Sequence, residues 1–138
     1  DPQKAAISDQ WMTWSTDGFM GTFFPVFWQL VRTEESQRDY NKIAEMAKQS
    51  AEVLKVLEGH LDNNKFVAGD DFTYGDIPLG VLIHKYFVLD IKRPSMPGIE
   101  AWYQRLTERN PYKEHAMQPF GNSPEEFLKL QTKGEKNL

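Results

Sequence analysis

FVAGDDFTYGDI, residues 66–77, is an acidic, glycine-containing stretch with apolar helical patterns on both sides of it. Its carboxylates at Asp70, Asp71 and Asp76 suit a metal loop, a catalytic cluster or the start of a helix. The residue order favours the helix start. Thr73 is a good N-cap residue, and Asp76, three positions later, can accept a hydrogen bond from the Thr73 backbone N–H. The stretch is therefore predicted to be a capping box, with Asp in place of the commoner Glu.

Two apolar residues flank this box in the positions of a hydrophobic staple. Phe72 precedes the cap, and Ile77 is the fourth helical position. Loss of the Asp76 carboxylate should lower stability by about 1 kcal/mol, the usual contribution of a cap. A calcium loop needs oxygen ligands at alternate positions, a central glycine and a distal Glu, which this stretch does not provide. Asp70 and Asp71 are expected to be solvated, and no metal site is predicted.

Two long helical patterns surround the box. Residues 39–61 repeat apolar side chains every three or four positions, with Lys, Glu and Gln on the opposite face. That pattern is typical of an amphipathic surface helix. Residues 74–89 are apolar nearly all round, which predicts a helix buried on every side at the centre of the fold.

Helical patterns cover most of the remaining chain. Gly18, Gly21 and Pro25 interrupt the first of them, so a kink or break is expected there. Pro97 suits a first helical turn, and the Asn110-Pro111 pair should end the helix that follows. Additional helices are therefore predicted at residues 1–14, from the interruption to about residue 32, at residues 97–109 and at residues 112–117.

Strand-like alternation is nearly absent, so the sequence predicts an all-α protein, a helical bundle of about five or six helices. The length of 138 residues suits one domain. Residues 1–117 are expected to form the helical domain. Residues 118–138 are expected to be a polar C-terminal tail that packs on that domain or extends from it.

Composition excludes several classes of function. Sixteen basic residues against twenty acidic ones leave a net charge of −4, which argues against a nucleic-acid surface. The absence of cysteine excludes disulfides and thiolate chemistry, and His60, His84 and His115 lack metal-ligand spacing. No apolar run of about 18 residues predicts a membrane span. A cytoplasmic protein is expected.

Three segments resemble one family, the C-terminal domain of the glutathione transferases. KFVAGDDFTYGDIPLG, residues 65–80, is similar to the capping-box region that opens its core helix. PGIEAWYQRLTERNPYKEHAM, residues 97–117, resembles a later helix and its short successor, although Asn110 separates Arg109 from Pro111 here. DQWMTWSTDGF, residues 9–19, resembles the opening helix of bacterial members. The resemblance extends over roughly residues 5–117.

The resemblance implies a two-domain protein in which this chain and a second domain have different functions. In this family a thioredoxin-like N-terminal domain binds glutathione and supplies the catalytic residue, and no segment of this sequence resembles it. The chain would then be the helical half, with one wall of the electrophile pocket, much of a homodimer contact and no catalytic residue of its own. Glutathione would be a co-substrate of the parent protein, and this chain alone should bind no cofactor and be inactive.

The family places its first helix beside the active-site cleft and the partner subunit, and this one is rich in aromatic residues. The candidate wall of a hydrophobic pocket is Trp14, Phe19 and Phe23, unless these rings belong to the core. Asp17 is a candidate contact for the glutathione amine across a dimer interface, as in some family members, with a solvated carboxylate as the alternative.

A different class of function fits the same fold. Transferase-like helical domains also occur as non-catalytic interaction modules, and an independent helical protein is a third interpretation. A catalytic half should leave an apolar face uncovered on its first and central helices, where the other domain docks. We therefore expect the isolated chain to expose an apolar patch or to dimerise over it.

Overall fold

The computed structural model describes residues 1–135, and within them the chain is helical. Residues 2–32 form one continuous helical run of two α-helical and two π-helical segments. The run consists of α1 (Pro2–Trp14), η1 (Ser15–Met20), α2 (Gly21–Phe27) and η2 (Trp28–Arg32). The later helices are η3 (Glu35–Gln37, a 3₁₀ turn), α3 (Tyr40–Leu61), α4 (Asp76–Val88), α5 (Pro97–Thr107), α6 (Asn110–His115) and α7 (Pro124–Glu135). With the first run counted as one helix and the 3₁₀ turn left out, residues 1–135 contain six helices. The prediction of an all-α bundle of about five or six helices is confirmed.

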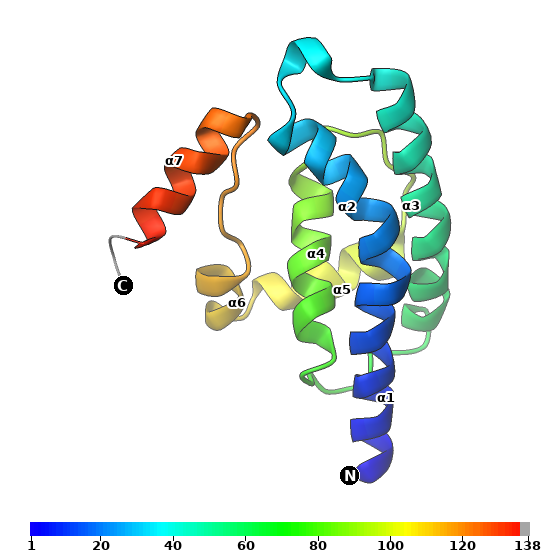
Figure 1. Ribbon diagram of the computed structural model, residues 1–138. Coiled ribbons are helices and arrows are strands. Elements are labelled where there is room, and N and C mark those ends of the chain that lie inside the picture. The colour runs from blue at the N-terminus through cyan, green and yellow to red at the C-terminus, as the bar shows by residue number, and fades with distance from the viewer. Residues whose placement is uncertain (136–138) are drawn as a thin grey trace.

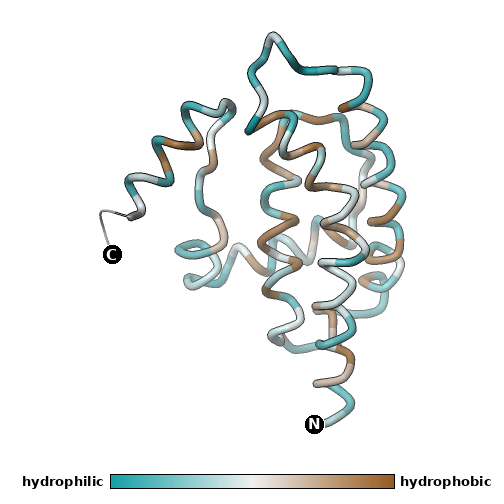
Figure 2. Tube along the Cα trace, in the orientation of Figure 1, coloured by the Kyte–Doolittle hydropathy of each residue, from teal (hydrophilic) through white to brown (hydrophobic). Residues whose placement is uncertain are grey.

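The helices form a bundle around α4 (Figure 1). Helix α2 packs on α3, α1 packs on α4, and α5 crosses behind α4 to contact α3. Figure 2 shows hydrophobic residues along most of α4. Its fully buried members include Leu79 and Ile83, which share one core with Leu54 and Leu57 of α3 and with Trp102 of α5. Within residues 1–135 there is no helix with both the length and the apolar character needed to span a bilayer.

The first helix continues through the positions where an interruption was expected. Pro25 lies inside α2 and has no N–H for the helical ladder, so it leaves a carbonyl one turn earlier without that partner. The π segments η1 and η2 flank α2, and such wider turns accommodate local irregularities without ending a helix. Gly18 and Gly21 therefore do not break the run: of the expected kink or break, the break is absent, and the helix continues to Arg32 as expected.

Asp76, the acidic residue of the predicted box, is completely buried, and its carboxylate accepts four hydrogen bonds. Its Oδ2 accepts from the Thr73 backbone N–H at 2.8 Å, and its Oδ1 accepts from the Val67 N–H and the Trp102 Nε1–H, both at 2.9 Å. The Thr73 hydroxyl does not cap a backbone N–H. It accepts from Ser8 Oγ at 3.0 Å and donates to Asp76 Oδ2 at 3.3 Å. The carboxylate thus joins the start of α4 to the preceding loop and to α5.

The two predicted staple residues have other surroundings. The Phe72 ring packs edge-on against Phe66 at 6.0 Å, and the guanidinium of Arg109 lies 3.7 Å from its centre. The regular helix starts only at Asp76, and Ile77 remains 51% exposed. Ile77 therefore has little buried surface with which to form a staple.

The C-terminal segment contains a helix that the sequence analysis missed. Ser123 Oγ accepts from the Glu126 N–H at 3.2 Å, and Pro124 occupies the first turn of α7. Ser-Pro-Glu-Glu is itself a capping-box sequence, and it was the overlooked signal. Before it, the Phe120 ring packs against Phe27 at 5.1 Å. A boundary between a domain of residues 1–117 and a tail of residues 118–138 stays a prediction.

Candidate functional site

A shallow groove runs along one face of α1 and η1. Its lining residues recur every three or four positions, so they lie on one side of the continuous helix. They are Ala6, Asp9, Gln10, Thr13, Trp14, Asp17 and Gly18. The groove is therefore made almost entirely by the first 18 residues, and it includes two of the residues predicted as site residues, Trp14 and Asp17.

Trp14 forms the aromatic part of this groove. Its ring packs edge-on against the buried Trp11 at 5.2 Å, and Trp11 in turn lies 4.6 Å from the His60 ring. The indole also covers Gly18, where a Cβ atom would come within 2.9 Å of the Trp14 Nε1. Gly18 thus permits the close approach that fixes the ring, and its π-helical segment is of the kind that often occurs at functional sites.

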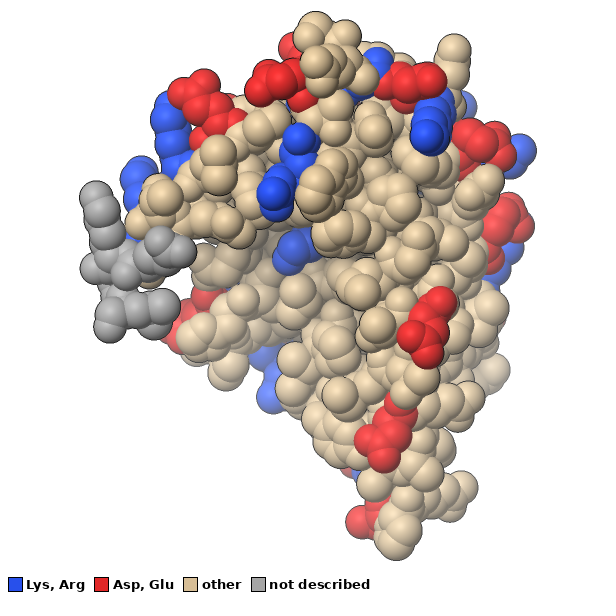
Figure 3. Space-filling view, viewed as in Figure 1, with Lys and Arg blue, Asp and Glu red and all other residues tan. Residues whose placement is uncertain are grey.

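The groove carries negative charge. Asp9 and Asp17 line it, and no Lys or Arg is among its lining residues. Asp9 accepts from the Tyr74 hydroxyl at 3.0 Å, and burial together with this carboxylate raises the pKa of Tyr74. Asp17 is exposed to solvent. Figure 3 shows acidic side chains along the visible side of α1, and this arrangement favours a cationic group such as an ammonium.

Phe19 and Phe23 do not line this groove, which corrects their assignment to a pocket wall. They are 0% and 1% exposed, and their rings stack on each other at 5.1 Å. Both also meet Tyr86 of α4 edge-on at 5.9 Å. They belong to the core because their side of the helix faces α4. The sequence could not separate them from Trp14, since aromatic residues occur all round this helix.

Two exposed aromatic residues were not selected from the sequence. Phe24 and Trp28 are each 45% exposed and lie 5.9 Å apart, between α2 and the start of α3. Arg32 stacks on Trp28 at 4.7 Å and on Phe127 of α7 at 4.4 Å. Their helical offset from the buried Phe23 and Phe27 was the available signal, because buried and exposed faces alternate with helical spacing.

The histidines have ordinary structural partners. His84 Nδ1 lies 3.0 Å from the Tyr103 hydroxyl, and burial, with a smaller effect of Lys85, lowers the pKa of His84. His60 Nε2 lies 2.8 Å from the Val67 carbonyl oxygen. Within the described part of the chain, no three metal-capable side chains come together.

The fold and groove together define a helical domain with an acidic, aromatic first helix, and comparisons place it in a known family. Residues 19–110 match the family described as glutathione S-transferase, C-terminal domain. The chain belongs to that family. Among its curated relatives is glutathione S-transferase GstB of Escherichia coli strain K12, 29% identical over 118 residues, which are 86% of this chain and 57% of that protein. Glutathione S-transferase 3 of Zea mays is 29% identical over 120 residues and matches 80% of this chain and 52% of its own length.

A solved structure agrees with the family assignment. The theta class glutathione S-transferase of Xanthomonas axonopodis pv. citri, with glutathione bound, is 39% identical and superposes with a TM-score of 0.83. The match covers 88% of this chain and 64% of that one. The chain thus spans between about half and two thirds of the length of these relatives.

Proposed function

We propose that this chain is the electrophile-pocket and dimer-contact domain of a cytoplasmic glutathione transferase that adds the glutathione thiolate to a small hydrophobic electrophile. The observation that carries the proposal is the α1–η1 groove, where an indole and a carboxylate lie side by side on an open helix face. The thioredoxin-like domain that binds glutathione and lowers the pKa of its thiol would lie outside this chain. The greater length of the relatives supports this arrangement.

A second observation supports a docking partner for α4. Tyr74, Ile77 and Val88 recur on one side of this helix and its entry, and they are 44%, 51% and 54% exposed. Met12, one turn beyond Asp9 on the neighbouring α1, is also exposed. An uncovered apolar face on an otherwise buried helix is typical of an interface. We assign this face to the thioredoxin-like domain of the same parent.

The two groove residues have distinct proposed roles. The Trp14 indole would pack against the apolar body of the electrophile and exclude water from it. The Asp17 carboxylate would accept a hydrogen bond from the ammonium group of glutathione held by a partner subunit. Neither residue activates the thiol, so both act by positioning the reactants.

The exposed pair Phe24 and Trp28 supports the dimer part of the proposal. Two large rings at the surface of one helix, beside the apolar side chains of Pro25 and Met46, suit a subunit contact. Size-exclusion chromatography of the Trp28→Glu variant tests this. The proposal expects a shift from dimer to monomer, and an unchanged elution volume would contradict it.

The activity is tested by fusing this chain to the N-terminal part of the Xanthomonas axonopodis relative. The fusion should join glutathione to 1-chloro-2,4-dinitrobenzene, with a new C–S bond and loss of chloride, whereas the chain alone should not. Trp14→Ala should raise KM for the electrophile about tenfold through loss of aromatic contact. Val56→Ala, at an exposed position of α3 outside the groove and the proposed contacts, is the control, and it should leave that KM unchanged.

The opposite results would favour the alternative. A folded fusion that binds glutathione but transfers it to no electrophile would overturn the enzyme proposal and favour a non-catalytic interaction module. Equal effects of Trp14→Ala and Val56→Ala would remove the α1–η1 groove from the proposal and leave the family assignment intact.

A further inference from the structure

Two arginines lie one helical turn apart at the C-terminal end of α5. Arg105 belongs to the last turn of the helix, and just beyond it the Arg109 N–H donates to the Leu106 carbonyl at 3.1 Å. Neither arginine lines the α1–η1 groove, and neither guanidinium forms an ion pair within residues 1–135. The carboxylates of this acidic protein therefore do not neutralise the pair.

Each of the two guanidinium groups lies over an aromatic ring. Arg109 lies 3.7 Å from the centre of the Phe72 ring, and Arg105 lies 5.8 Å from the centre of the Phe66 ring. The two rings meet edge-on, 6.0 Å apart. These four side chains form one unit, the arginine–phenylalanine cluster. Stacking on a ring fixes the plane of a guanidinium and leaves its N–H edge available to an oxyanion.

Most N–H donors of the cluster are unused. Arg105 Nε and Nη2 donate to the Lys65 carbonyl at 3.0 and 2.8 Å, which holds this side chain in place and leaves Nη1 for another acceptor. The guanidinium of Arg109 is exposed and donates no hydrogen bond within the described residues. A guanidinium that is already held in place loses little entropy when it binds an anion, so the cluster is preorganised.

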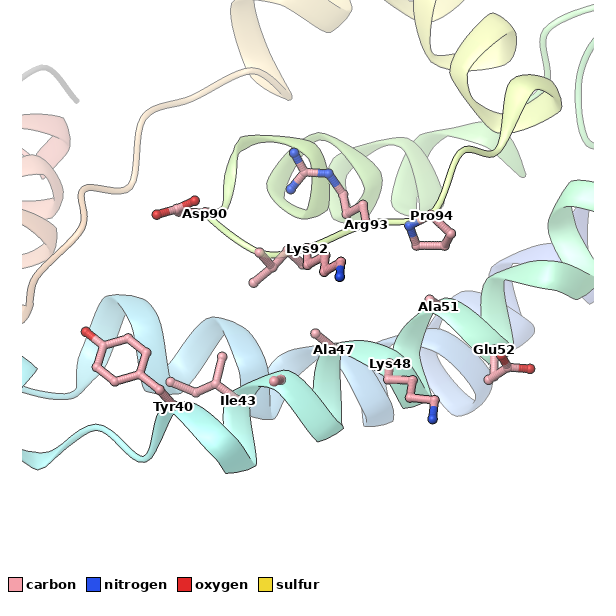
Figure 4. Close-up of a pocket in the computed structure, with 12 residues that line it drawn as sticks. Tyr40, Ile43, Ala47, Lys48, Ala51, Glu52, Asp90, Lys92, Arg93 and Pro94 are labelled. Atoms are coloured by element: carbon pink, nitrogen blue, oxygen red, sulfur yellow. The ribbon is translucent and has the colours of Figure 1, made fainter.

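The remaining arginines have structural contacts instead. Arg38 and Arg93 each donate to two backbone carbonyls. Figure 4 shows the Arg93 guanidinium beside the end of α4, turned away from α3. Arg32 lies between the rings of Trp28 and Phe127 and so joins η2 to α7. Only at the end of α5 do two guanidinium groups share one cluster.

The charges around the cluster leave a positive excess. Asp71 pairs with Lys4 at 2.8 Å, so these two charges cancel. In residues 65–72 and 105–109 the groups without an ion pair are three cations and two carboxylates, namely Arg105, Arg109, Lys65, Asp70 and Glu108. Such an excess, in a protein with a net charge of −4, favours an anionic partner at this position.

We propose that the arginine–phenylalanine cluster binds a phosphate monoester on another protein, a phosphoserine or phosphothreonine. The N–H edge of Arg109 donates two parallel hydrogen bonds to phosphate oxygens, and Arg105 Nη1 donates a third. A phosphate with nearly two negative charges matches two guanidinium groups better than a single carboxylate does. Arg109, Lys65 and Glu108 are exposed, so the site is an open surface that a peptide can reach.

Two labelled peptides test the proposal on the full chain. Both are fluorescein-labelled heptapeptides of glycine and serine, and one carries a central phosphoserine. Fluorescence anisotropy should show roughly tenfold tighter binding of the phosphorylated peptide, as expected for two exposed charge pairs, and this preference should shrink in salt. In NMR spectra of the ¹⁵N-labelled chain, the same peptide should move the Nε–H signals of Arg105 and Arg109.

Matched variants separate the guanidinium fork from its charge. Arg109→Lys keeps the charge and the cover over Phe72, but it should weaken phosphopeptide binding at least roughly threefold because the ammonium cannot donate in a fork. Arg32→Lys, the same change at the other stacked arginine, should have no effect on binding. Glu108→Gln should strengthen binding roughly twofold by removing a nearby negative charge.

The source of the phosphate is tested by competition. Free O-phosphoserine should displace the peptide only at higher concentration than an unlabelled phosphopeptide, because it lacks the flanking backbone. Equal displacement would overturn the assignment to a protein partner.

Three further results would overturn the proposal. One is equal binding of the two peptides, another is a set of NMR shifts confined to Arg32 and Arg38, and the third is an Arg109→Lys variant that binds the phosphopeptide as the wild type does. No glutathione, electrophile or fused domain enters these experiments. Their failure is therefore distinguishable from failure of the proposed transferase function.

Discussion

At the scale of single residues, Asp76 contributes more than a helix cap. Its carboxylate is fully buried and accepts from two backbone N–H groups, one indole and the Thr73 hydroxyl. Removal of the acceptor leaves the buried N–H groups of Val67 and Trp102 and the partly buried N–H of Thr73 without this partner. Asp76→Ala should therefore lower the free energy of unfolding by about 3 kcal/mol or more, above the ~1 kcal/mol of a cap alone. Urea unfolding followed by tryptophan fluorescence measures the difference.

Asp71 provides the control for this experiment. It belongs to the same acidic stretch, but it is exposed and pairs at the surface with Lys4 at 2.8 Å, and that contact lowers the pKa of Asp71. Asp71→Ala should leave the unfolding midpoint unchanged within error. Equal losses in the two variants would mean that Asp76 acts only through the charge of the loop.

His84 gives the fold a pH dependence. Burial lowers the pKa of His84 below its ordinary value of 6.5, so the folded state binds fewer protons than the unfolded chain. Stability is then complete above pH 6.5 and falls as the pH decreases below it. His84→Gln cannot titrate and keeps a polar group near Tyr103. It should lose less stability than the wild type between pH 7 and pH 5.5.

His115 is the comparison for that measurement, because it is an exposed histidine of α6. Denaturant titrations of His115→Gln should follow the wild-type pH dependence. If His84→Gln also follows it, the decrease in stability comes from other groups.

Single residues show most clearly which contacts can and cannot be predicted from the sequence. The Thr73 and Asp76 pair was visible as a spacing, and the hydrogen bond between Thr73 N–H and Asp76 is present. The bonds from Val67 and Trp102 were not visible, because they join residues 9 and 26 positions from Asp76. Local patterns carry no information on such contacts until the helices are placed.

At the scale of elements, replacement of two glycines by alanine should have opposite effects on stability. A Cβ atom at Gly75 would meet the Ser8 Cα of α1 at 2.8 Å, so this glycine allows α4 to begin against α1. A Cβ atom at Gly21 would meet nothing within 4 Å. Gly75→Ala should destabilise the protein by roughly 1–3 kcal/mol through overpacking, whereas Gly21→Ala should stabilise it by about 0.5–1 kcal/mol.

Thermal unfolding of both variants checks this pair. A Gly21→Ala variant that melts below the wild type would indicate that the junction of η1 and α2 needs glycine for another reason. A Gly75→Ala variant with wild-type stability would mean that α1 shifts away without loss.

The elements themselves were predictable where spacing was regular. The apolar repeat of α3 gave its existence and its buried face, and Pro97 marked the start of α5. The long first helix was harder. Its aromatic residues occur on all sides, so only the packing against α4 separates the buried Phe19 from the partly buried Trp14.

At the scale of the whole molecule, the apolar face of α4 should control how the isolated chain behaves. Ile77→Lys combined with Val88→Lys places two charges on this exposed face. The double variant should bind less of a neutral hydrophobic dye and should associate less at high concentration, with little change in stability. Dye fluorescence and light scattering measure the effects.

Val56 is the matched position for this test, since it is 59% exposed on α3, away from α4. Val56→Lys should leave dye binding unchanged. Equal dye binding by the double variant and the wild type would show that the dye and other molecules of the chain bind elsewhere than on the apolar face of α4.

The buried Asp76 cluster also has a kinetic consequence. Its hydrogen bonds to three partner residues close loops of increasing sequence separation, with the partners 3, 9 and 26 residues away. The nearest can form as α4 nucleates, whereas the last requires α5 to have docked, and longer loops close at a greater entropic penalty. Trp102 therefore reports the arrival of α5, and its fluorescence should change late in refolding. Trp102→Phe, which removes the indole N–H donor, should then mainly accelerate unfolding, because the bond from Trp102 to Asp76 forms after the rate-limiting barrier.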